Sequence, residues 1–353
     1  MSSAPPAEPT IGAVRLALRP VTRPLKRVAW RAKIERDAHR ARRRPADLAI
    51  FHEFRPPPAG GGNQTLRAVF GEMARRGIRI ESNTISTDSR AVLFNSFNFD
   101  FRRFELLARR VDGIRMVHRV GAVTSLYRGF DDGTDSRLAR INRDHADATI
   151  AISHATIEMY RQIGVELVRP VVVYNGCDDM IFNRHGRIPF GRDRKIRLIS
   201  SSWSDNPRKG GPTYSWLEDH LDWSRYEFTF VGNTQERFER IRYLPPLASN
   251  ELADQLRQHD IFVTATEHDA YSNALVEALS CGLPALYLDS GGSAEAVQDA
   301  GFGFRDRGDI PELLDRLVDE YEDRQQAISL PTLAEIVDAY LEVLGLHDFV
   351  AAR

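Results

Sequence analysis

The run of residues 269–284 constrains the fold of this chain more than any other stretch. It carries two carboxylates eight positions apart, Asp269 in a short polar turn and Glu277 in a helical pattern that a glycine and a proline end. Apolar segments at 261–264 and 285–288 flank the run and predict buried strands. Strand, loop, helix and strand form one repeat of a parallel α/β sheet, in which ligand-binding groups gather at the carboxyl ends of the strands.

Length and composition indicate a globular chain of two domains. The 353 residues are 42% hydrophobic and 27% charged, enough for two units of roughly 100–200 residues each. No apolar run approaches the roughly 18 residues that a membrane helix needs, and the first residues lack the pattern of a secretory signal. The two cysteines, Cys177 and Cys281, form no metal-binding or redox motif, so we expect a reduced cytoplasmic protein.

Charge is distributed unevenly along the chain. Residues 1–44 contain twelve Lys/Arg against three acidic residues, so they carry +9 and the rest carries −10 in a chain whose net charge is −1. The basic segment 15–44 also contains Trp30 among aliphatic residues. This pattern favours peripheral contact with an anionic membrane surface, and a solvated basic extension is the alternative. The acidic remainder argues against a nucleic-acid partner.

Two α/β units follow the basic extension. The first opens with a predicted strand at 47–52, a glycine-rich turn, a helix at 64–76 and a strand at 78–80. The later predicted strands of the two units lie at 91–94, 114–117, 148–152, 171–174, 196–200 and 227–231. A stretch rich in glycine, asparagine, aspartate and arginine at 176–195 indicates a linker, and an amphipathic helix at 332–346 ends the pattern.

These patterns divide the chain into four parts. We expect a basic extension over residues 1–45 and a first Rossmann-like domain over 46–176. A second Rossmann-like domain follows over 177–330, and a crossover helix with its tail occupies 331–353. Each domain would place its ligand groups at the carboxyl ends of its strands.

Several segments resemble retaining GT-B glycosyltransferases of family 4, also called glycosyl transferases group 1. The similar segments, taken in chain order, are 60–62, His118, 172–182, 207–210, 244–252 and 269–277. Their order and spacing carry the resemblance, which covers roughly residues 46–346. It implies an α/β protein of the GT-B class, with two Rossmann-like domains facing a central cleft, the first on the acceptor side and the second binding the nucleotide sugar. The last helix would cross back to the first domain.

The resemblance implies a set of donor-binding residues around one diphosphate. They are Gly61, Gly62, Asn63, Arg208, Lys209, Tyr271, Ser272, Asn273, Ala274 and Glu277. Lys209 supplies a point charge for the diphosphate, and free backbone N–H groups at residues 272–274 suit a phosphate. Ordinary helix capping by Ser272 or Asn273 is the alternative there. Glu277, among apolar neighbours, would accept hydrogen bonds from the two hydroxyls of a ribose.

The implied catalytic residues are His118 and Asp269. Asp269 would lie near the sugar ring and stabilise positive charge at the anomeric carbon. His118 would face the reacting centre from the first domain, although a buried histidine near a strand end is the plain alternative. The chain departs from the family pattern in three ways: Asp269 stands where glutamate is usual, the first domain is short, and the arginine expected before Lys209 is missing, with Arg208 available to replace it.

The acidic run 131–135 does not fit a metal site. As a calcium loop it has Asn142 rather than glutamate at the twelfth position. We interpret it as a loop in which Asp135 or Ser136 caps the next helix. No metal or other cofactor is expected, because Lys209 and a helix terminus would neutralise the diphosphate.

The sequence therefore predicts transfer of a sugar from a nucleotide-sugar donor to an acceptor hydroxyl of a glycan, a lipid-linked glycan or a small molecule, with retention. The departures from the family pattern leave two alternatives open. One is a nucleotide-sugar-binding protein that lost catalysis. The other is a different GT-B enzyme, such as a hydrolase or an epimerase.

Overall fold

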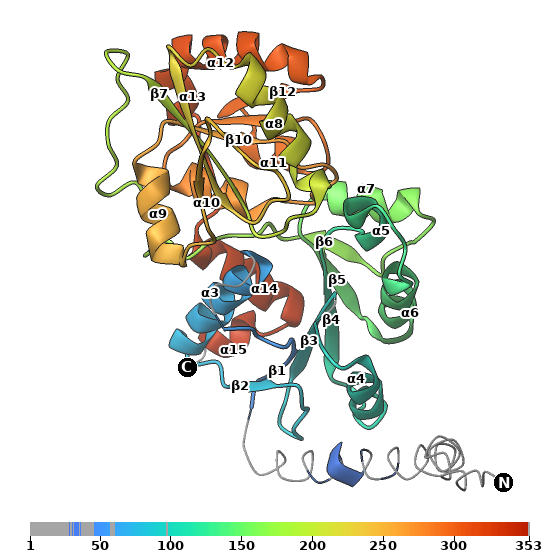
Figure 1. Ribbon diagram of the computed structural model, residues 1–353. Coiled ribbons are helices and arrows are strands. Elements are labelled where there is room, and N and C mark those ends of the chain that lie inside the picture. Colours follow the sequence, from blue (N-terminus) through green and yellow to red (C-terminus); the bar gives the residue numbers. More distant parts are fainter. Residues whose placement is uncertain are drawn as a thin grey trace, which may run out of the picture.

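The computed structural model describes residues 28, 30, 32–34, 36, 46–56, 61–96 and 98–351. Two α/β units lie one beyond the other (Figure 1), and each is built on a six-stranded parallel sheet. Most of the expected extension 1–45, and with it most of the segment 15–44, lies outside the described residues, as does Gly60. Among the residues that are described, no helix has both the length and the apolar character that crossing a membrane requires.

The first sheet has the strand order β2-β1-β3-β4-β5-β6. Its strands are β1 (Leu48–Phe51), β2 (Ile80–Ser82), β3 (Ala91–Asn95), β4 (Arg115–Val120), β5 (Ala148–Ala151) and β6 (Pro170–Val172). Every pairing is parallel. The order reverses between β1 and β3, so this unit presents its crevice at the carboxyl ends of those two strands.

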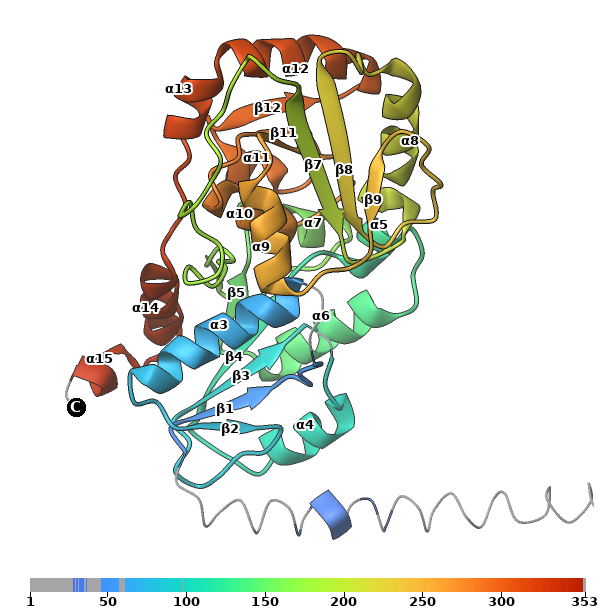
Figure 2. The same cartoon turned by 60° about the vertical axis from the view of Figure 1, so that its left-hand side comes forward.

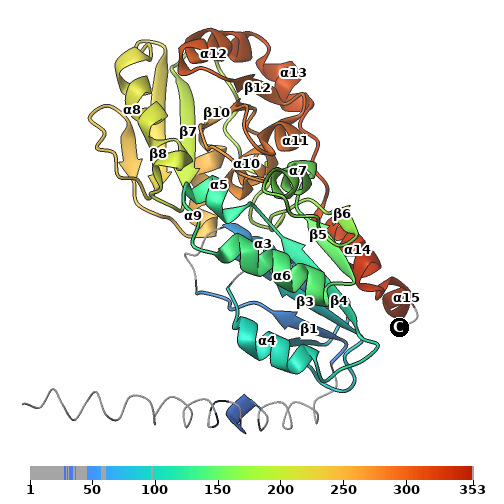
Figure 3. The ribbon, with the colours of Figure 1, turned by 90° about the vertical axis from the view of Figure 1, so that its right-hand side faces the viewer.

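Helices cover both faces of the first sheet, as Figures 2 and 3 show from two sides. They are α3 (Gly61–Arg75), α4 (Phe101–Ala108), α5 (Thr124–Arg128), α6 (Thr134–His145) and α7 (His154–Gln162). The apolar positions predicted for the first helix, including Leu66 and Val69, are buried in one core layer. Phe104 and Ile141 belong to a second core layer, which α4 and α6 cover on the opposite face.

The second sheet has the order β12-β11-β10-β7-β8-β9, again all parallel. Its strands are β7 (Ile196–Ser202), β8 (Tyr226–Gly232), β9 (Arg242–Leu244), β10 (Ile261–Thr264), β11 (Ala285–Leu288) and β12 (Gly301–Phe304). The order reverses between β7 and β10, the two strands that precede Lys209 and Asp269. The topology therefore brings these two residues to one crevice although 60 positions separate them.

Two layers of helices cover the second sheet. One face carries α9 (Ser249–Arg257), α10 (Asn273–Ser280) and α11 (Ser293–Val297). The other carries α8 (Gly211–His220), α12 (Ile310–Asp319) and α13 (Tyr321–Gln326), with short 3₁₀ turns η1 (Pro207–Lys209) and η2 (Arg307–Asp309) at the edges. The apolar layer under α10 continues into the first unit, where it includes Val120 and Tyr160. The two units thus share one hydrophobic core.

The predicted crossover helix is confirmed. Helix α14 (Leu333–Leu344) begins at a capping box, in which Thr332 accepts from the Glu335 N–H and the Glu335 carboxylate accepts from Thr332. It lies beside α3 in the core layer of the first unit, red next to blue in Figure 1. A short helix, α15 (His347–Ala351), follows it.

Candidate functional site

Lys209 and Asp269 meet at the switch point of the second sheet. The Lys209 Nζ lies 2.9 Å from Asp269 Oδ2. The Asn206 side chain accepts from the Arg208 N–H and shapes η1, and Gly210 takes a left-handed φ of 95° that ends the turn. Burial works against the charge of Lys209, but the Asp269 carboxylate outweighs it, so the pKa of Lys209 is raised. Lys209 and Asp269 therefore form an ion pair at the site.

The backbone of Asp269 is fixed by the glycine pair that follows β11. The Gly292 N–H donates to the Asp269 carbonyl at 2.8 Å. Gly291 has a φ of 64°, and a Cβ at that position would stand 2.0 Å from the same carbonyl oxygen. Only glycine allows this approach, so the two strands place the carboxylate of Asp269 firmly at the crevice.

Glu277 is a buried carboxylate without a protein partner. Its side chain belongs to α10 and is 8% exposed. Within the described part of the chain no group forms a hydrogen bond or an ion pair with it. Burial alone raises the pKa of Glu277 to about 8. A buried acceptor that no protein group satisfies is an expected place for ligand hydroxyls.

The start of α10 is open rather than capped. Ser272 occupies the N-cap position, but its side chain forms no capping hydrogen bond, so the alternative of ordinary capping is not what the structure shows. The first N–H groups of an α-helix have no partner inside the helix, and here they include those of Asn273 and Ala274. Tyr271, just before them, is buried and stacks on Tyr174 with 5.0 Å between ring centroids.

The glycine turn of the first unit packs directly on α10. A Cβ on Gly61 would stand 2.4 Å from the Cβ of Asn273, whereas Gly62 faces open space. Asn63 exchanges two hydrogen bonds with the Arg55 backbone, at 3.1 and 3.2 Å. The starts of α3 and α10 therefore meet, so the positive ends of the two helix dipoles lie close together.

Helix α5 of the first unit lies next to Lys209. The Tyr127 ring centroid lies 5.2 Å from Lys209 Nζ. Arg208, expected at the donor, instead donates from its guanidinium to the Leu126 carbonyl, and Asn206 reaches the Arg128 carbonyl at 3.4 Å. Arg208 thus joins the two units in this structure.

The predicted cleft position of His118 was wrong. The ring is fully buried, stacks on Phe94 with 4.4 Å between centroids and lies 3.1 Å from Asn142 Nδ2. Burial lowers its pKa to about 3. The physical reason is the alternation of side chains along a strand. His118 points into the layer under α4 and α6, and the next residue, Arg119, points to the opposite face.

That opposite face holds polar residues that the sequence analysis missed. Arg119 is 4% exposed and donates to Tyr340, Asn95 and Asn175, at 2.8, 3.0 and 2.7 Å. His52, at the end of β1, lies 3.1 Å from Asn95 Nδ2 and has a pKa that burial lowers to about 4. Their positions at the ends of β1, β3 and β4 were the signal that could have revealed them.

The acidic run 131–135 also differs from its interpretation. Asp135 does not cap its own helix. Its two oxygens accept the N–H groups of Thr124 and Ser125, both at 2.8 Å, at the start of α5. The residue before α6, Gly133, makes no side-chain cap. In the described residues no group of three or more histidine, cysteine, aspartate or glutamate side chains is arranged to hold a metal.

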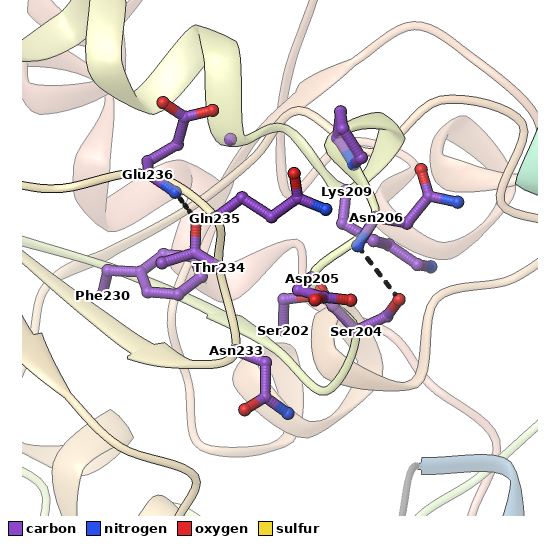
Figure 4. Close-up of a pocket in the computed structure, with 12 residues that line it drawn as sticks. Ser202, Ser204, Asp205, Asn206, Lys209, Phe230, Asn233, Thr234, Gln235 and Glu236 are labelled. Atoms are coloured by element: carbon purple, nitrogen blue, oxygen red, sulfur yellow. Dashed lines mark hydrogen bonds between the residues drawn. The ribbon is translucent and has the colours of Figure 1, made fainter. Parts of the chain in front are cut away.

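A pocket opens beside Lys209, between the loops that follow β7 and β8 (Figure 4). Asn206 and Lys209 line one side, and Asn233, Gln235 and Glu236 come from the other. The sequence analysis assigned no role to the loop 233–236. The pocket extends the polar crevice away from α10.

The second unit is similar in sequence to a known protein family. Residues 218–323 match the family model described as Glycosyl transferases group 1. The match includes Asp269, α10 and Glu277. D-inositol 3-phosphate glycosyltransferase from Streptomyces scabiei is 29% identical over 83 residues, and its counterpart from Paenarthrobacter aurescens is 30% identical over 95 residues. These alignments cover 24% and 27% of this chain but only 19% and 23% of those relatives.

Solved structures establish the fold over most of the chain. A sucrose-phosphate synthase from Thermosynechococcus elongatus superposes with a TM-score of 0.67 at 13% identity, covering 87% of this chain and 100% of that one. Anabaena HepE in complex with UDP-glucose gives a TM-score of 0.57 at 14% identity, covering 86% and 98%. The two parallel sheets and their helices therefore form the GT-B fold that the sequence predicted.

Proposed function

We propose that this protein is a glycosyltransferase that moves a sugar from a nucleotide-sugar donor to an acceptor hydroxyl, with retention of the anomeric configuration. The observation that carries the proposal is the convergence of Lys209, Asp269 and the open start of α10 at one switch point, facing the start of α3. The group 1 match over residues 218–323 supports it.

Each part of a donor has a matching group in this crevice. The diphosphate would lie at the starts of α10 and α3, with Lys209 as its point charge. The ribose would give two hydroxyl hydrogen bonds to Glu277, the buried carboxylate without a partner. Asp269, released from Lys209 by the incoming diphosphate, would turn to the sugar. The loop 233–236 lies across a small pocket from Lys209.

In the proposed reaction the bond from the anomeric carbon to the β-phosphate oxygen breaks as the acceptor oxygen bonds to that carbon on the same face. The acceptor proton passes to the leaving phosphate. Lys209 and the helix amides stabilise the charge on the phosphate, and Asp269 stabilises the positive charge at the sugar. These groups supply the charge stabilisation, so we propose that no metal is required, and chelation with EDTA should leave turnover unchanged.

UDP-glucose is the first donor to test, because HepE was solved with it. We would incubate the full chain with UDP-glucose and other nucleotide sugars and follow nucleotide release with and without candidate glycan acceptors. Lys209→Ala and Glu277→Ala should each abolish release. Lys195→Ala, at a lysine whose Nζ donates to the Trp223 carbonyl, is the matched control and should behave like the wild type. Unchanged release in both site variants would disprove the assignment.

Two other functions predict different results. A binding protein without catalysis would bind UDP-glucose but release no UDP with any acceptor. A hydrolase would release UDP and free glucose at a rate that acceptors do not change. The match of residues 218–323 to the Glycosyl transferases group 1 model favours a transferase.

We also propose that the basic segment 15–44 brings the enzyme to an anionic membrane surface from the cytoplasmic side. In the described residues of this segment, one side chain packs on the protein and others face solvent. Val28 and Trp30 are 66% and 37% exposed, whereas Ile34 is buried in the core layer of the first unit. Ile34 would hold the segment to the protein while exposed apolar and basic side chains meet the lipid.

A further inference from the structure

Arg119 is the only buried lysine or arginine among the described residues. It follows His118 at the end of β4 and points toward α14 and the linker. Its Nε donates to the Tyr340 hydroxyl at 2.8 Å, its Nη1 to Asn95 Oδ1 at 3.0 Å and its Nη2 to Asn175 Oδ1 at 2.7 Å. The guanidinium is thus held in one orientation by three protein acceptors.

All three acceptors are neutral. In the described part of the chain no carboxylate forms an ion pair with Arg119, whereas the buried Asp260 contacts both Arg194 and Arg197. A buried charge with no counter-charge is costly and is usually paired with an opposite charge or a ligand. The hydrogen-bonding capacity of Arg119 is largely used, but its positive charge is not balanced.

The guanidinium of Arg119 is connected to the start of α10 by hydrogen bonds through Asn175. Asn175, which accepts from Arg119, donates from Nδ2 to Asn273 Oδ1 at 3.1 Å. Thr65 of α3 donates to the same oxygen at 2.8 Å. One asparagine therefore separates the guanidinium from the first residue of α10. Neither α3 nor α10 has an acidic residue in its first turn, and Asp269, the carboxylate shortly before α10, is paired with Lys209.

We propose that Arg119 supplies, from inside the first unit, the second positive charge for a diphosphate bound where α3 and α10 begin. It takes the place of the arginine that is missing before Lys209, since Arg208 is engaged with Leu126 in this structure. Arg119 is a positioning residue, because it acts through Asn175 and Asn273 rather than by contact. The inference rests on the proposed nucleotide-sugar function and adds the source of the second charge.

One variant should neutralise the charge of Arg119 and leave the side chain in its place. Asn95→Asp places a carboxylate on Arg119 on the side away from α10, where Asn95 Oδ1 already accepts at 3.0 Å. Arg119 then gains a buried partner, and His52, whose Nδ1 lies 3.1 Å from Asn95 Nδ2, can donate to the new carboxylate as its Nδ1–H tautomer. Thermal stability should therefore be kept while diphosphate binding weakens. A residue that only supports the fold would move stability and binding in the same direction.

Calorimetric titration of the full chain with UDP, inorganic pyrophosphate and uridine tests the proposal. Arg119→Gln and Asn95→Asp should weaken UDP and pyrophosphate binding about tenfold or more, because a full buried charge that acts on the anion through Asn175 and Asn273 is lost or neutralised. Arg119→Lys, which keeps the charge, should lose less than about threefold. Uridine binding should not change. Arg115→Gln, on the same strand and bonded to the Val343 carbonyl, is the matched control.

The outcomes are distinct. If Arg119→Lys loses as much affinity as Arg119→Gln, or if Asn95→Asp binds UDP as the wild type does, the charge role is overturned. If the wild type binds pyrophosphate but neither UDP nor UDP-glucose, the proposed function fails and the pyrophosphate series still decides the role of Arg119. If the wild type binds none of these anions, both proposals are overturned.

Discussion

The Nζ of Lys209 and the Oδ2 of Asp269 are 2.9 Å apart, so the site cation and the site carboxylate neutralise each other in this structure. Both side chains are largely shielded, 21% and 17% exposed. A diphosphate that enters has to displace Asp269 from Lys209. The same displacement would free Asp269 for the sugar, which links donor binding to completion of the catalytic arrangement.

Asp269→Asn should separate binding from catalysis. Removing the competing carboxylate leaves Lys209 free, so UDP should bind as tightly as in the wild type or a few-fold more tightly. The rate of UDP release from UDP-glucose should fall by roughly 100-fold, as expected when a charge-stabilising group is lost. Titration with UDP and steady-state kinetics measure the two effects. Asp299→Asn, an exposed aspartate that does not line the pocket beside Lys209, is the control. Loss of UDP affinity in Asp269→Asn would contradict the competition.

Glu277 should make donor binding depend on pH. Its pKa of about 8 means that the free protein holds it protonated at neutral pH, whereas ribose hydroxyls prefer the ionised acceptor. UDP affinity should therefore increase as pH rises from about 6.5 to 9. Glu277→Gln should bind more weakly at high pH and lose this dependence. Titrations across that range, with buffer blanks at each pH, measure it, and a wild-type affinity independent of pH would contradict the ribose role.

Glu277 should also make the stability of the fold depend on pH. Stability should fall as pH rises, whereas UDP affinity should increase. The folded pKa of Glu277 is raised above its value of 4.5, so the folded state binds more protons than the unfolded state between about pH 4.5 and 8. The stability that the protonated side chain contributes is fully present below that range and is lost as pH rises through it, by up to about 4 kcal/mol. Glu277→Gln should lack this loss. Chemical unfolding at pH 5, 6.5 and 8 tests the difference.

Gly61 should tolerate no side chain. A Cβ there would stand 2.4 Å from the Cβ of Asn273, so Gly61→Ala forces α3 away from α10. We expect a loss of about 1–3 kcal/mol in unfolding free energy and weaker UDP binding. Gly71→Ala, farther along the same helix, is the matched control, because a methyl group on Gly71 would meet nothing within 4 Å. Equal behaviour of the two variants would contradict the close contact between the helices.

His118 should matter for folding rather than for turnover. His118→Leu leaves Asn142 without its ring contact, which should lower unfolding free energy by about 1–3 kcal/mol. At a temperature where the variant is folded, kcat/KM should stay within about threefold of the wild type, since ΔΔG‡ would be near zero. A loss of about 100-fold in kcat with unchanged stability would restore the acceptor-side role.

Deletion of residues 1–44 should abolish sedimentation of the protein with vesicles that contain anionic lipid. The deleted segment carries +9, and the attraction should weaken as salt is added. Vesicles of neutral lipid are the control. Persistent binding of the shortened protein would contradict the membrane proposal.

Local pattern was sufficient to predict most of the strands. The segments predicted at 261–264 and 285–288 have the bounds of β10 and β11, because buried parallel strands are short apolar runs that need no partner to be recognised. The sequence analysis did not predict β9 or β12. Strand β9 has three largely exposed residues, and β12 alternates glycine with phenylalanine. Both are edge strands, which pairing rather than apolar pattern creates.

The sequence by itself determined the two α/β units, the crossover helix and the order of groups around Asp269 and Glu277, because each follows from periodicity or spacing along the chain. Tertiary structure alone decided which residues meet. Because side chains alternate along a strand, His118 points into the core and Arg119 points toward the linker. Because the strand order reverses between β7 and β10, Lys209 lies next to Asp269. Contacts across long sequence separations depend on how whole strands and helices pack, which no local pattern records.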